Sequence, residues 1–580
     1  MNKVFSKCTL LFLLVTGIIF ISIYINTQDC INETGLIWYQ KYFLFNKTLF
    51  SAPKEAFDTF FREILTDTRN DIYSLLLSPV YFLFKNSYKA YVYALFFTSY
   101  IPFVFCFYTF LSKYFFKIEE NNKNFKYIIL SIIIGTPLYW WIFLVGYPDL
   151  LSFAIFIVAM ILFFKNPFDK KIPFKNLAIF STLLYLSFLY RRWFLFVVLS
   201  FLISAAIALT VKNLADKNLS KQEKINALKA TASNICISGI IFSSLIFLLQ
   251  TNIFLSFFNS EYQSAFTDYK VSLYENLKIV FSFLNIPLCF FAISALIYSA
   301  KKHTFQILFA SLNLIVFFLV FNQINIICYD HMMIIMFWLI TLIFFGIYRI
   351  YSICPNKKSK TIFTLLVLFL FGLNFYDNLL GNNPEKYAYM TARNNLTPYK
   401  IPDYDKIKKI ESHLKNKIYN DSTFTYSIWA FEEHVFNPQI IFWQGDDYKY
   451  FEKGVFPPLI DEEALVIANW YFFPIINANE IYTTEPLELY ANKENSKILY
   501  KTVELLNNKK GFGAGYEKSD EIIELSEGKK VIKFVKTRPL TKQEQDDYKK
   551  FIIQMYPQSE KYFPDYHKEI YKEEKQIFQK

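Results

Sequence analysis

The sequence predicts a polytopic α-helical membrane protein of about eleven transmembrane helices, followed by an extracytoplasmic α/β domain at the C-terminus. The composition is 54% hydrophobic, with 67 Phe and 42 Tyr, which is too apolar for a chain made only of soluble domains. All the bilayer-length apolar stretches lie in residues 1–376, and residues 377–580 contain none. We therefore divide the chain into a transmembrane domain, 1–376, and a polar terminal domain, 377–580.

Eleven apolar stretches justify the predicted spans, since a helix needs roughly 20 mostly apolar residues to cross a bilayer. None of these stretches contains Asp, Glu, Lys, Arg or His. The first follows Lys3 and Lys7 as a signal peptide would, but no small-residue cleavage site comes after it, so we interpret it as a retained anchor. The predicted spans are 8–26, 90–112, 127–145, 150–164, 176–190, 193–211, 232–250, 279–299, 304–322, 332–348 and 361–376.

The positive charges predict the orientation of these spans. The segments 1–7, 113–126, 165–175, 212–229, 301–303 and 349–360 together hold 21 Lys and Arg residues, whereas the short loops on the other side hold few. Basic loops stay in the cytoplasm, so the N-terminus is predicted there, in a multi-pass protein of the inner (cytoplasmic) membrane. The terminal domain and a long first loop, 27–89, are then extracytoplasmic. Within that loop, the thirteen-residue apolar run 72–84 is too short to span and is predicted to lie at the interface.

Several function classes are disfavoured by composition. The net charge of +12 comes mostly from the cytoplasmic lysines, which can contact anionic lipid head groups, so it does not indicate a nucleic-acid partner. Spans without ionisable residues disfavour an ion-coupled transporter. The terminal domain has no cysteine and the chain has no CxxC pair, so no metal site is predicted. The cofactor stays unknown, because loop carboxylates that could bind a divalent cation carry no diagnostic spacing.

Polar residues gather instead at the predicted extracytoplasmic ends of the helices. A carboxylate there can deprotonate an incoming hydroxyl group, and a cation can stabilise the charge that builds up on a departing phosphate. This depth suits a lipid whose phosphate lies among the head groups, so the pattern predicts transfer of a sugar from a phosphate-linked lipid. The candidate catalytic carboxylates are Asp29, Glu33, Asp71 and Asp149; the candidate phosphate ligands are Arg191, Arg192 and His331; the supporting residues are Asp67, Tyr147 and Asp330.

Each candidate also has a plainer interpretation. The two arginines can be snorkelling anchors beside Trp193, which is the commonest role of such residues at helix ends. His331 can be a hydrogen-bonded interface residue, and the loop carboxylates can be ordinary solvated charges. Asp149 follows a Tyr-Pro turn between two closely spaced spans, which places it better than the others, although it can also simply cap the next helix.

Two local sequences resemble those of the GT-C glycosyltransferases, the integral-membrane enzymes that use polyprenyl-phosphate sugars. The run Asn70-Asp71-Ile72-Tyr73-Ser74-Leu75-Leu76-Leu77-Ser78-Pro79, followed by Phe84-Lys85-Asn86-Ser87, is similar to the segment after that family's acidic motif. Tyr329-Asp330-His331 is similar to its late polar turn before an apolar helix. The overall layout resembles the protein mannosyltransferase and lipid A aminoarabinose transferase types, with a first span, a long external loop and an external C-terminal domain.

This resemblance implies an inverting transfer from a lipid-linked sugar donor to a glycan, lipid or protein acceptor. By position after the first span, Asp29 or Glu33 would be the base, with Asp71 and Asp149 as the other candidates. The adjacent Asp-Glu pair typical of the protein mannosyltransferase branch is missing from the first loop, so the branch, the sugar and the acceptor stay open. The alternatives are a lipid-glycan flippase or transporter, a glycan polymerase or ligase, and a noncatalytic assembly protein.

The terminal domain is predicted to be a small α/β module. A helix is expected over 404–418, where apolar residues recur on one face. A hairpin connection is expected at 526–528, and the C-terminal end from 566 to 580 is expected to be a solvated helix or tail. Strands are expected at 423–430, 464–471, 487–491, 498–505, 521–525 and 530–535.

Overall fold

The computed structural model divides the chain into two compact units. Unit 1 contains Met1–Thr27 and Thr34–Pro398, and unit 2 contains Gln28–Glu33 and Tyr399–Lys580. Each unit is described separately. The structure describes residues 7–29, 33–66, 72–85, 87–118, 123–166, 168–256, 272–299, 304–323, 327–381, 396–398, 400, 403–406, 409, 410, 412, 413, 416, 427–429, 455, 456, 475, 476, 478–487, 497–557 and 560.

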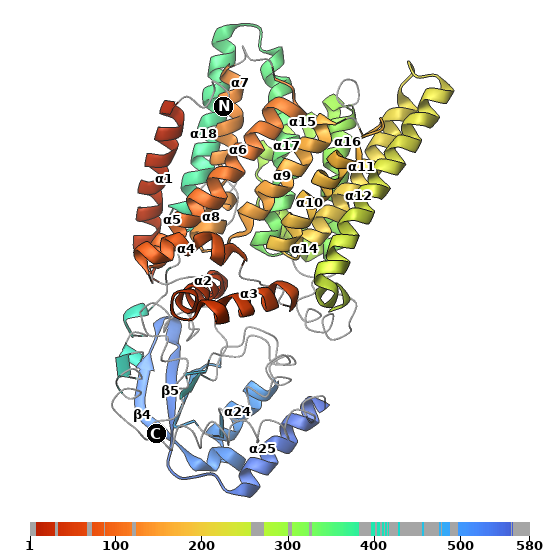
Figure 1. Cartoon of the computed structure of the whole chain (residues 1–580). Helices are drawn as coiled ribbons and strands as arrows, with labels where there is room; N and C mark the ends of the chain where they lie inside the picture. Colours follow the sequence, from red (N-terminus) through yellow and green to blue (C-terminus); the bar gives the residue numbers. More distant parts are fainter. Residues whose placement is uncertain are drawn as a thin grey trace. The chain divides into compact units, whose positions relative to one another are not determined.

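Unit 1 is a bundle of helices (Figure 1). Six helices or continuous helical segments among the described residues are long and apolar enough to cross a membrane, and two bent pairs raise the number to eight if each pair is one span. The predicted polytopic helical class is confirmed, and the count of eleven stays a prediction. The elements are α1 Lys7–Thr27, α2 Glu33–Ser51, α3 Pro53–Thr66, α4 Ile72–Phe84, α5 Tyr88–Leu95, η1 Phe96–Tyr100, α6 Ile101–Thr109, η2 Phe110–Phe115, α7 Lys123–Ile134, α8 Pro137–Leu144, α9 Asp149–Lys165, α10 Phe174–Tyr190, α11 Phe194–Ala215, α12 Lys221–Ser256, α14 Leu273–Ser282, α15 Ile286–Ser299, α16 Thr304–Asn322, α17 Tyr329–Ile353 and α18 Lys357–Leu379.

Two of the predicted spans are pairs of helices rather than single helices. The stretch 127–145 bends by 42° between α7 and α8, because the residue before Pro137 is disfavoured in the helical region and Thr136 is extended. The stretch 279–299 includes a 106° bend between α14 and α15. There the side chain of Asn285 accepts a hydrogen bond from the backbone N–H of Leu288 (2.9 Å) and starts the second helix of the pair.

The centre of unit 1 is α17, which is buried over most of its length and packs against α15 and α16. The close approach of α15 requires Gly346, because an added Cβ atom would lie 1.9 Å from the carbonyl oxygen of Phe291. At one end of the bundle, α2 and α3 lie across the helices, and α3 packs against α12 (Figure 1). The apolar run at 72–84 forms the helix α4, with Pro79 inside it.

Unit 2 contains a five-stranded sheet, so the predicted α/β class of the terminal domain is confirmed. The strands are β1 Ser427–Trp429, β2 Val455–Phe456, β3 Glu480–Glu485, β4 Tyr516–Glu524 and β5 Lys530–Lys536, in the order β2-β1-β3-β5-β4. β1 is parallel to both β2 and β3, whereas β5 is antiparallel to both β3 and β4. Two helices, α24 Lys497–Asn507 and α25 Lys542–Met555, contribute to the core that includes Ile481, Ile532 and Phe534.

The predicted elements of unit 2 have mixed outcomes. The hairpin of 521–525 and 530–535 is confirmed, with a turn at Ser526–Gly528 in which Gly528 has a φ of +76°. The strand predicted at 498–505 is wrong, because these residues belong to α24 and bury their apolar side chains with helical spacing. The strand β3 and the helix α25 were not predicted. The predicted strand 464–471 and the predicted tail 566–580 lie outside the described residues.

Candidate functional site

Three helix ends that are distant in the sequence meet in unit 1 and bring four candidate residues together. Asp149 is the first residue of α9, Arg191 directly follows α10, and Asp330 and His331 lie in the first turn of α17. The turn before α9 contains Gly146 at a φ of +96°, a backbone conformation that favours glycine. This turn is held in place because the hydroxyl of Tyr91 donates a hydrogen bond to the carbonyl of Gly146 (2.8 Å).

The guanidinium of Arg191 connects the two carboxylates. Its Nε donates to Oδ1 of Asp149 at 2.7 Å, and its Nη2 donates to Oδ2 of Asp330 at 3.3 Å. The indole Nε1 of Trp193 also donates to Oδ1 of Asp149 at 3.2 Å, and the ring of Trp38 from α2 lies 4.4 Å from the guanidinium carbon. Asp149 has no exposed surface and Arg191 is only 8% exposed, so this is a buried ion-pair network.

Asp149 keeps one unsatisfied oxygen in this network. Its Oδ2 atom is buried and has no hydrogen-bond partner among the residues that the structure describes. A buried acceptor without a donor costs about 1–3 kcal/mol, and more when it is charged. Its position at the start of α9 lowers this cost, because a helix N-terminus favours negative charge. A buried carboxylate oxygen that has no hydrogen-bond partner can accept a proton or a hydrogen bond from a ligand.

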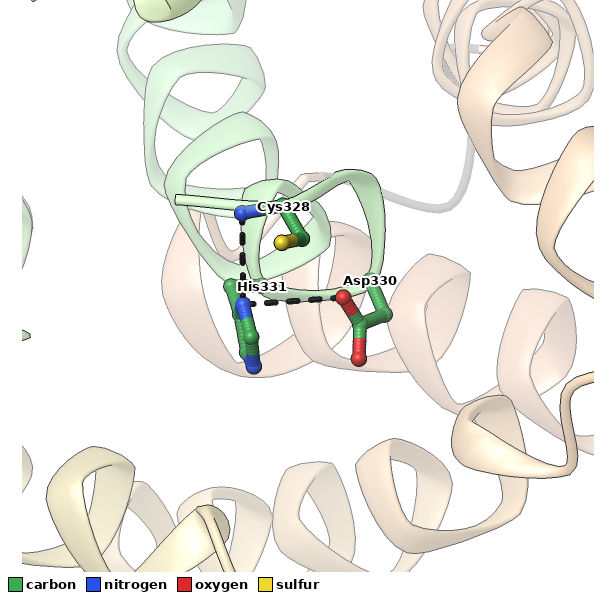
Figure 2. A group of neighbouring side chains, drawn as sticks. All are labelled: Cys328, Asp330 and His331. Carbon is green, nitrogen blue, oxygen red and sulfur yellow. Dashed lines mark hydrogen bonds and ion pairs between the residues drawn. The ribbon is translucent and has the colours of Figure 1, made fainter. Parts of the chain in front are cut away.

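His331 lies beside this network (Figure 2). Its Nδ1 accepts a hydrogen bond from the backbone N–H of Cys328 (3.3 Å) and lies 3.5 Å from Oδ1 of Asp330. Its ring packs between those of Trp193 and Phe321, with centroid distances of 5.0 and 4.3 Å. These contacts orient the imidazole toward the carboxylate that Arg191 also binds.

Cys328, Asp330 and His331 could hold a metal ion by distance alone, because one ligand atom from each lies within 4.8 Å of the others (Figure 2). Two features oppose a cation at this position. The cluster occupies the N-terminal turn of α17, where the helix dipole is positive, and Asp330 already pairs with the guanidinium of Arg191. We therefore interpret the cluster as a cap of α17, and we propose no metal there.

Arg192 points to a different set of partners. Its Nη1 donates to Oε1 of Gln250 at 2.5 Å, and its Nη2 donates to the carbonyl of Ile64 at 2.6 Å. The amide of Gln250 donates to the same carbonyl at 3.1 Å. Ile64 belongs to the last turn of α3, whose carbonyls lack helical partners, so Arg192 and Gln250 together anchor that helix end. Arg192 thus donates to α3 and α12, whereas Arg191 donates to Asp149 and Asp330.

Replacing Gln250 with Leu is expected to loosen the end of α3. The substitution removes the acceptor of Arg192 Nη1 and one of the two donors to the carbonyl of Ile64, in a place where Gln250 is only 1% exposed. Leaving such groups unsatisfied costs about 1–3 kcal/mol. Faster amide hydrogen exchange over Pro53–Thr66 is the measurement that reports it.

Gln222→Leu serves as the matched control, because Gln222 is exposed and its side chain contacts only a neighbouring turn of α12 through Asn226 (3.2 Å). It is expected to leave exchange in α3 unchanged. Equal exchange in the wild type and Gln250→Leu would show that the anchor contributes nothing to the position of α3.

The remaining candidates lie elsewhere. Asp29 belongs to unit 2 and pairs with Lys400 at 3.1 Å. Tyr147 is buried in the turn before α9, with its ring centroid 6.2 Å from that of Trp141. Glu33 is the first residue of α2, and its side chain is outside the described part of the chain, as are Asp67 and Asp71 entirely.

Sequence reasoning missed two residues that contact the arginines, Trp38 and Gln250. Trp38 lies in α2, a helix that was not predicted within the first loop, and no sequence motif marks Trp38. Gln250 ended a predicted span as an ordinary polar residue. The signal that could have identified it is its glutamine side chain at the end of a long apolar run, where an unpaired amide would be costly.

Neither the family models nor the curated proteins include a match to this chain. Among solved structures, the chain is similar to the crystal structure of ArnT from Cupriavidus metallidurans bound to undecaprenyl phosphate, with a TM-score of 0.45 and 8% sequence identity. The similarity covers 93% of this chain and 100% of that chain. We assign no activity from it.

Proposed function

We propose that this protein is a membrane glycosyltransferase that moves a sugar from a polyprenyl-phosphate carrier to a glycan, lipid or protein acceptor on the extracytoplasmic side. The observation that supports it most is the convergence of Asp149, Arg191, Asp330 and His331 from three separate helix ends. All the predicted spans are free of ionisable residues, and the four groups lie at the ends of apolar helices, which supports a position at the depth of a lipid head group. The local resemblance to GT-C sequences agrees with this assignment.

In the proposed reaction, an acceptor hydroxyl attacks the anomeric carbon of the sugar. The bond from that carbon to the phosphate oxygen breaks, the hydroxyl proton passes to a carboxylate, and the carrier phosphate leaves with the additional negative charge. Arg191 suits the leaving phosphate, since a guanidinium stays charged and has five N–H donors. Its hydrogen bonds with described residues use Nε and Nη2, so Nη1 has donors for a phosphate oxygen.

The charge of the network determines how a phosphate can enter it. Two carboxylates and one guanidinium sum to one negative charge when His331 is neutral, and this would repel an anion. His331 is neutral in this geometry, because its Nδ1 accepts from the backbone N–H of Cys328, so a proton taken up by one of the carboxylates as the phosphate binds would bring the sum to zero. We propose that Asp149 and Asp330 orient Arg191, that the neutral His331 is a further phosphate ligand, and that the base is Asp149 or one of the first-loop carboxylates Asp29, Glu33 and Asp71.

A transfer assay tests this function. The purified full chain in liposomes is supplied with polyprenyl-phosphate sugars, and the wild type is compared with Asp29→Asn, Asp71→Asn and Asp149→Asn. The variant that lacks the base is expected to lose about 10²–10⁴-fold in rate. Asp169→Asn is the control, because Asp169 follows the C-terminal end of α9 and pairs with Lys212 in the last turn of α11 (2.7 Å), at the helix ends opposite to Asp149 and Arg191. Full activity in all three test variants would exclude Asp29, Asp71 and Asp149 as the base and leave Glu33, and no turnover of any donor by the wild type would contradict the function.

A further inference from the structure

The sheet of unit 2 has a second face that the core does not use. Side chains of a strand alternate between two faces, and Ile481 and Ile532 point to the core that contains α24 and α25. Glu480 and Tyr482 of β3 therefore point to the opposite face, and the register places Tyr482 beside Lys533 of β5. In Figure 1, α24 and α25 lie on one side of the β4–β5 hairpin and the turquoise pieces, which include 403–406, 409–410 and 412–413, lie on the other.

This second face is polar and yet buried. Glu480 is 1% exposed and Tyr482 is 3% exposed. The hydroxyl of Tyr482 donates to Oε2 of Glu480 at 2.8 Å, and Nε2 of His413 lies 3.5 Å from the same oxygen. Beside them, the ammonium of Lys533 donates to Oε2 of Glu521 at 2.5 Å. Burying Glu480, Tyr482 and Lys533 costs free energy that burying apolar side chains would not, which is typical of a binding site rather than of a packing surface.

A groove of about 380 Å³ opens over these residues. Its polar lining comes from Lys406, Lys409, His413, Tyr482, Glu521, Glu524 and Lys533. Its apolar lining includes Ile410 and Val531, which are both buried. The volume lies within the range of roughly 300–1,000 Å³ that is usual for small-molecule sites.

The chemistry of the lining restricts the ligand. The lining supplies hydrogen-bond donors, hydrogen-bond acceptors and apolar side chains, so a suitable ligand both accepts and donates hydrogen bonds and also presents an apolar surface. The hydrogen bond from Lys533 lowers the pKa of the Glu521 carboxyl, which keeps it ionised as an acceptor at neutral pH. Among the described residues, Lys409 has no ion-pair partner, so its ammonium is placed for an acidic group of the ligand.

We propose that this groove binds a saccharide, with the hydroxyl groups held by Glu521, Lys533 and Tyr482 and an acidic substituent paired with Lys409. Sugar hydroxyls both donate and accept, and the C–H face of a pyranose ring fits the floor formed by Ile410 and Val531. The assignment of this saccharide to the acceptor rests on the proposed function, whereas the binding itself does not.

Saccharide binding is measured with the full chain in nanodiscs by saturation-transfer NMR and calorimetry. The probes are chitotriose, which is neutral, and trigalacturonic acid, which is acidic. Both are expected to bind, the acidic probe more tightly, and Lys409→Ala is expected to remove that preference. Glu521→Gln is expected to weaken both by about tenfold or more, the cost of losing one charged hydrogen bond. Lys501→Ala on α24, whose ion pair with Glu504 lies away from the groove lining, is the control with unchanged binding.

Two outcomes overturn the proposal: no binding of either probe, or binding that Lys409→Ala and Glu521→Gln leave unchanged. Both residues are exposed, so neither variant is expected to prevent folding. The transfer assay separates this proposal from the proposed function. Groove variants are expected to raise the KM for the acceptor and to leave kcat and the KM for the polyprenyl-phosphate donor unchanged, whereas the variant that lacks the base is expected to lose transfer without changing saccharide binding. If a higher donor KM results instead, the groove holds the donor sugar and the acceptor assignment is wrong.

Discussion

Arg191→Met is expected to destabilise unit 1 by about 3–5 kcal/mol and to abolish sugar transfer. The substitution leaves Asp149, which has no exposed surface, without its ion-pair partner, and removes one partner from Asp330 as well. The midpoint of denaturant unfolding in detergent measures the first effect, and the transfer rate in liposomes measures the second. Lys212→Met, which breaks the partly exposed pair with Asp169, is the control and is expected to change stability by less than about 1 kcal/mol.

A double variant separates the structural role of Arg191 from its chemical role. Asp149→Leu together with Arg191→Met removes both partners of the buried pair, and such replacements often restore stability. The double variant is therefore expected to regain most of the lost stability and none of the activity. Recovery of transfer together with stability would show that the pair only supports the fold, and it would contradict a role in the reaction.

Gly35→Ala is expected to displace α2 from the turn that precedes Asp149. An added Cβ atom at residue 35 would lie 1.4 Å from the carbonyl oxygen of Val145, so either α2 or the turn must move. Overpacking of this kind costs about 1–3 kcal/mol, and more where the backbone cannot relax. Trp38 lies one turn further along α2 against Arg191, so the displacement also disturbs the site, where a shift of about 1 Å can lower kcat about 100-fold.

The same measurements on Gly239→Ala provide the comparison. Gly239 lies inside α12, and nothing is within 4 Å of the position that its Cβ would occupy. Alanine in a helix is favoured over glycine by about 0.8–1.0 kcal/mol, so this variant is expected to be slightly more stable and fully active. If Gly35→Ala behaves in the same way, the contact between α2 and the Val145 turn does not position the site.

The sequence predicted a large part of the network because short loops restrict helix ends. The two spans around Tyr147 and Asp149 are separated by a few residues, and so are the two around Arg191, so each polar loop must lie at a bundle end. The excess of Lys and Arg in the loops of the other side predicts that these two loops lie at the same end of the bundle as Asp330. What the sequence left open was which helices are neighbours, and this decides which charges pair.

The adjacent arginines show this limit clearly. Arg191 and Arg192 looked equivalent in the sequence, yet the backbone at the end of α10 sends one toward Asp149 and the other toward Ile64 and Gln250. The contact of Arg192 with Gln250 is made at a break in α12, because Gln250 itself has the non-helical angles φ −148° and ψ 39°. No glycine or proline in the sequence marks this break. In unit 2, the groove combines β3, β4, β5 and the segment around 409, and such a combination depends on tertiary packing that local patterns do not contain.

Photocrosslinking tests most directly the claim that the Arg191 network receives a lipid phosphate. A polyprenyl phosphate with a diazirine next to the phosphate is irradiated with the full chain in nanodiscs, and the adducts are mapped by mass spectrometry. Adducts are expected in peptides that contain residues 191–193 and 328–331, with a lower yield in Arg191→Met. Adducts confined to the opposite helix ends, at 166–173 and 216–220, or a yield that Arg191→Met leaves unchanged, would contradict the claim.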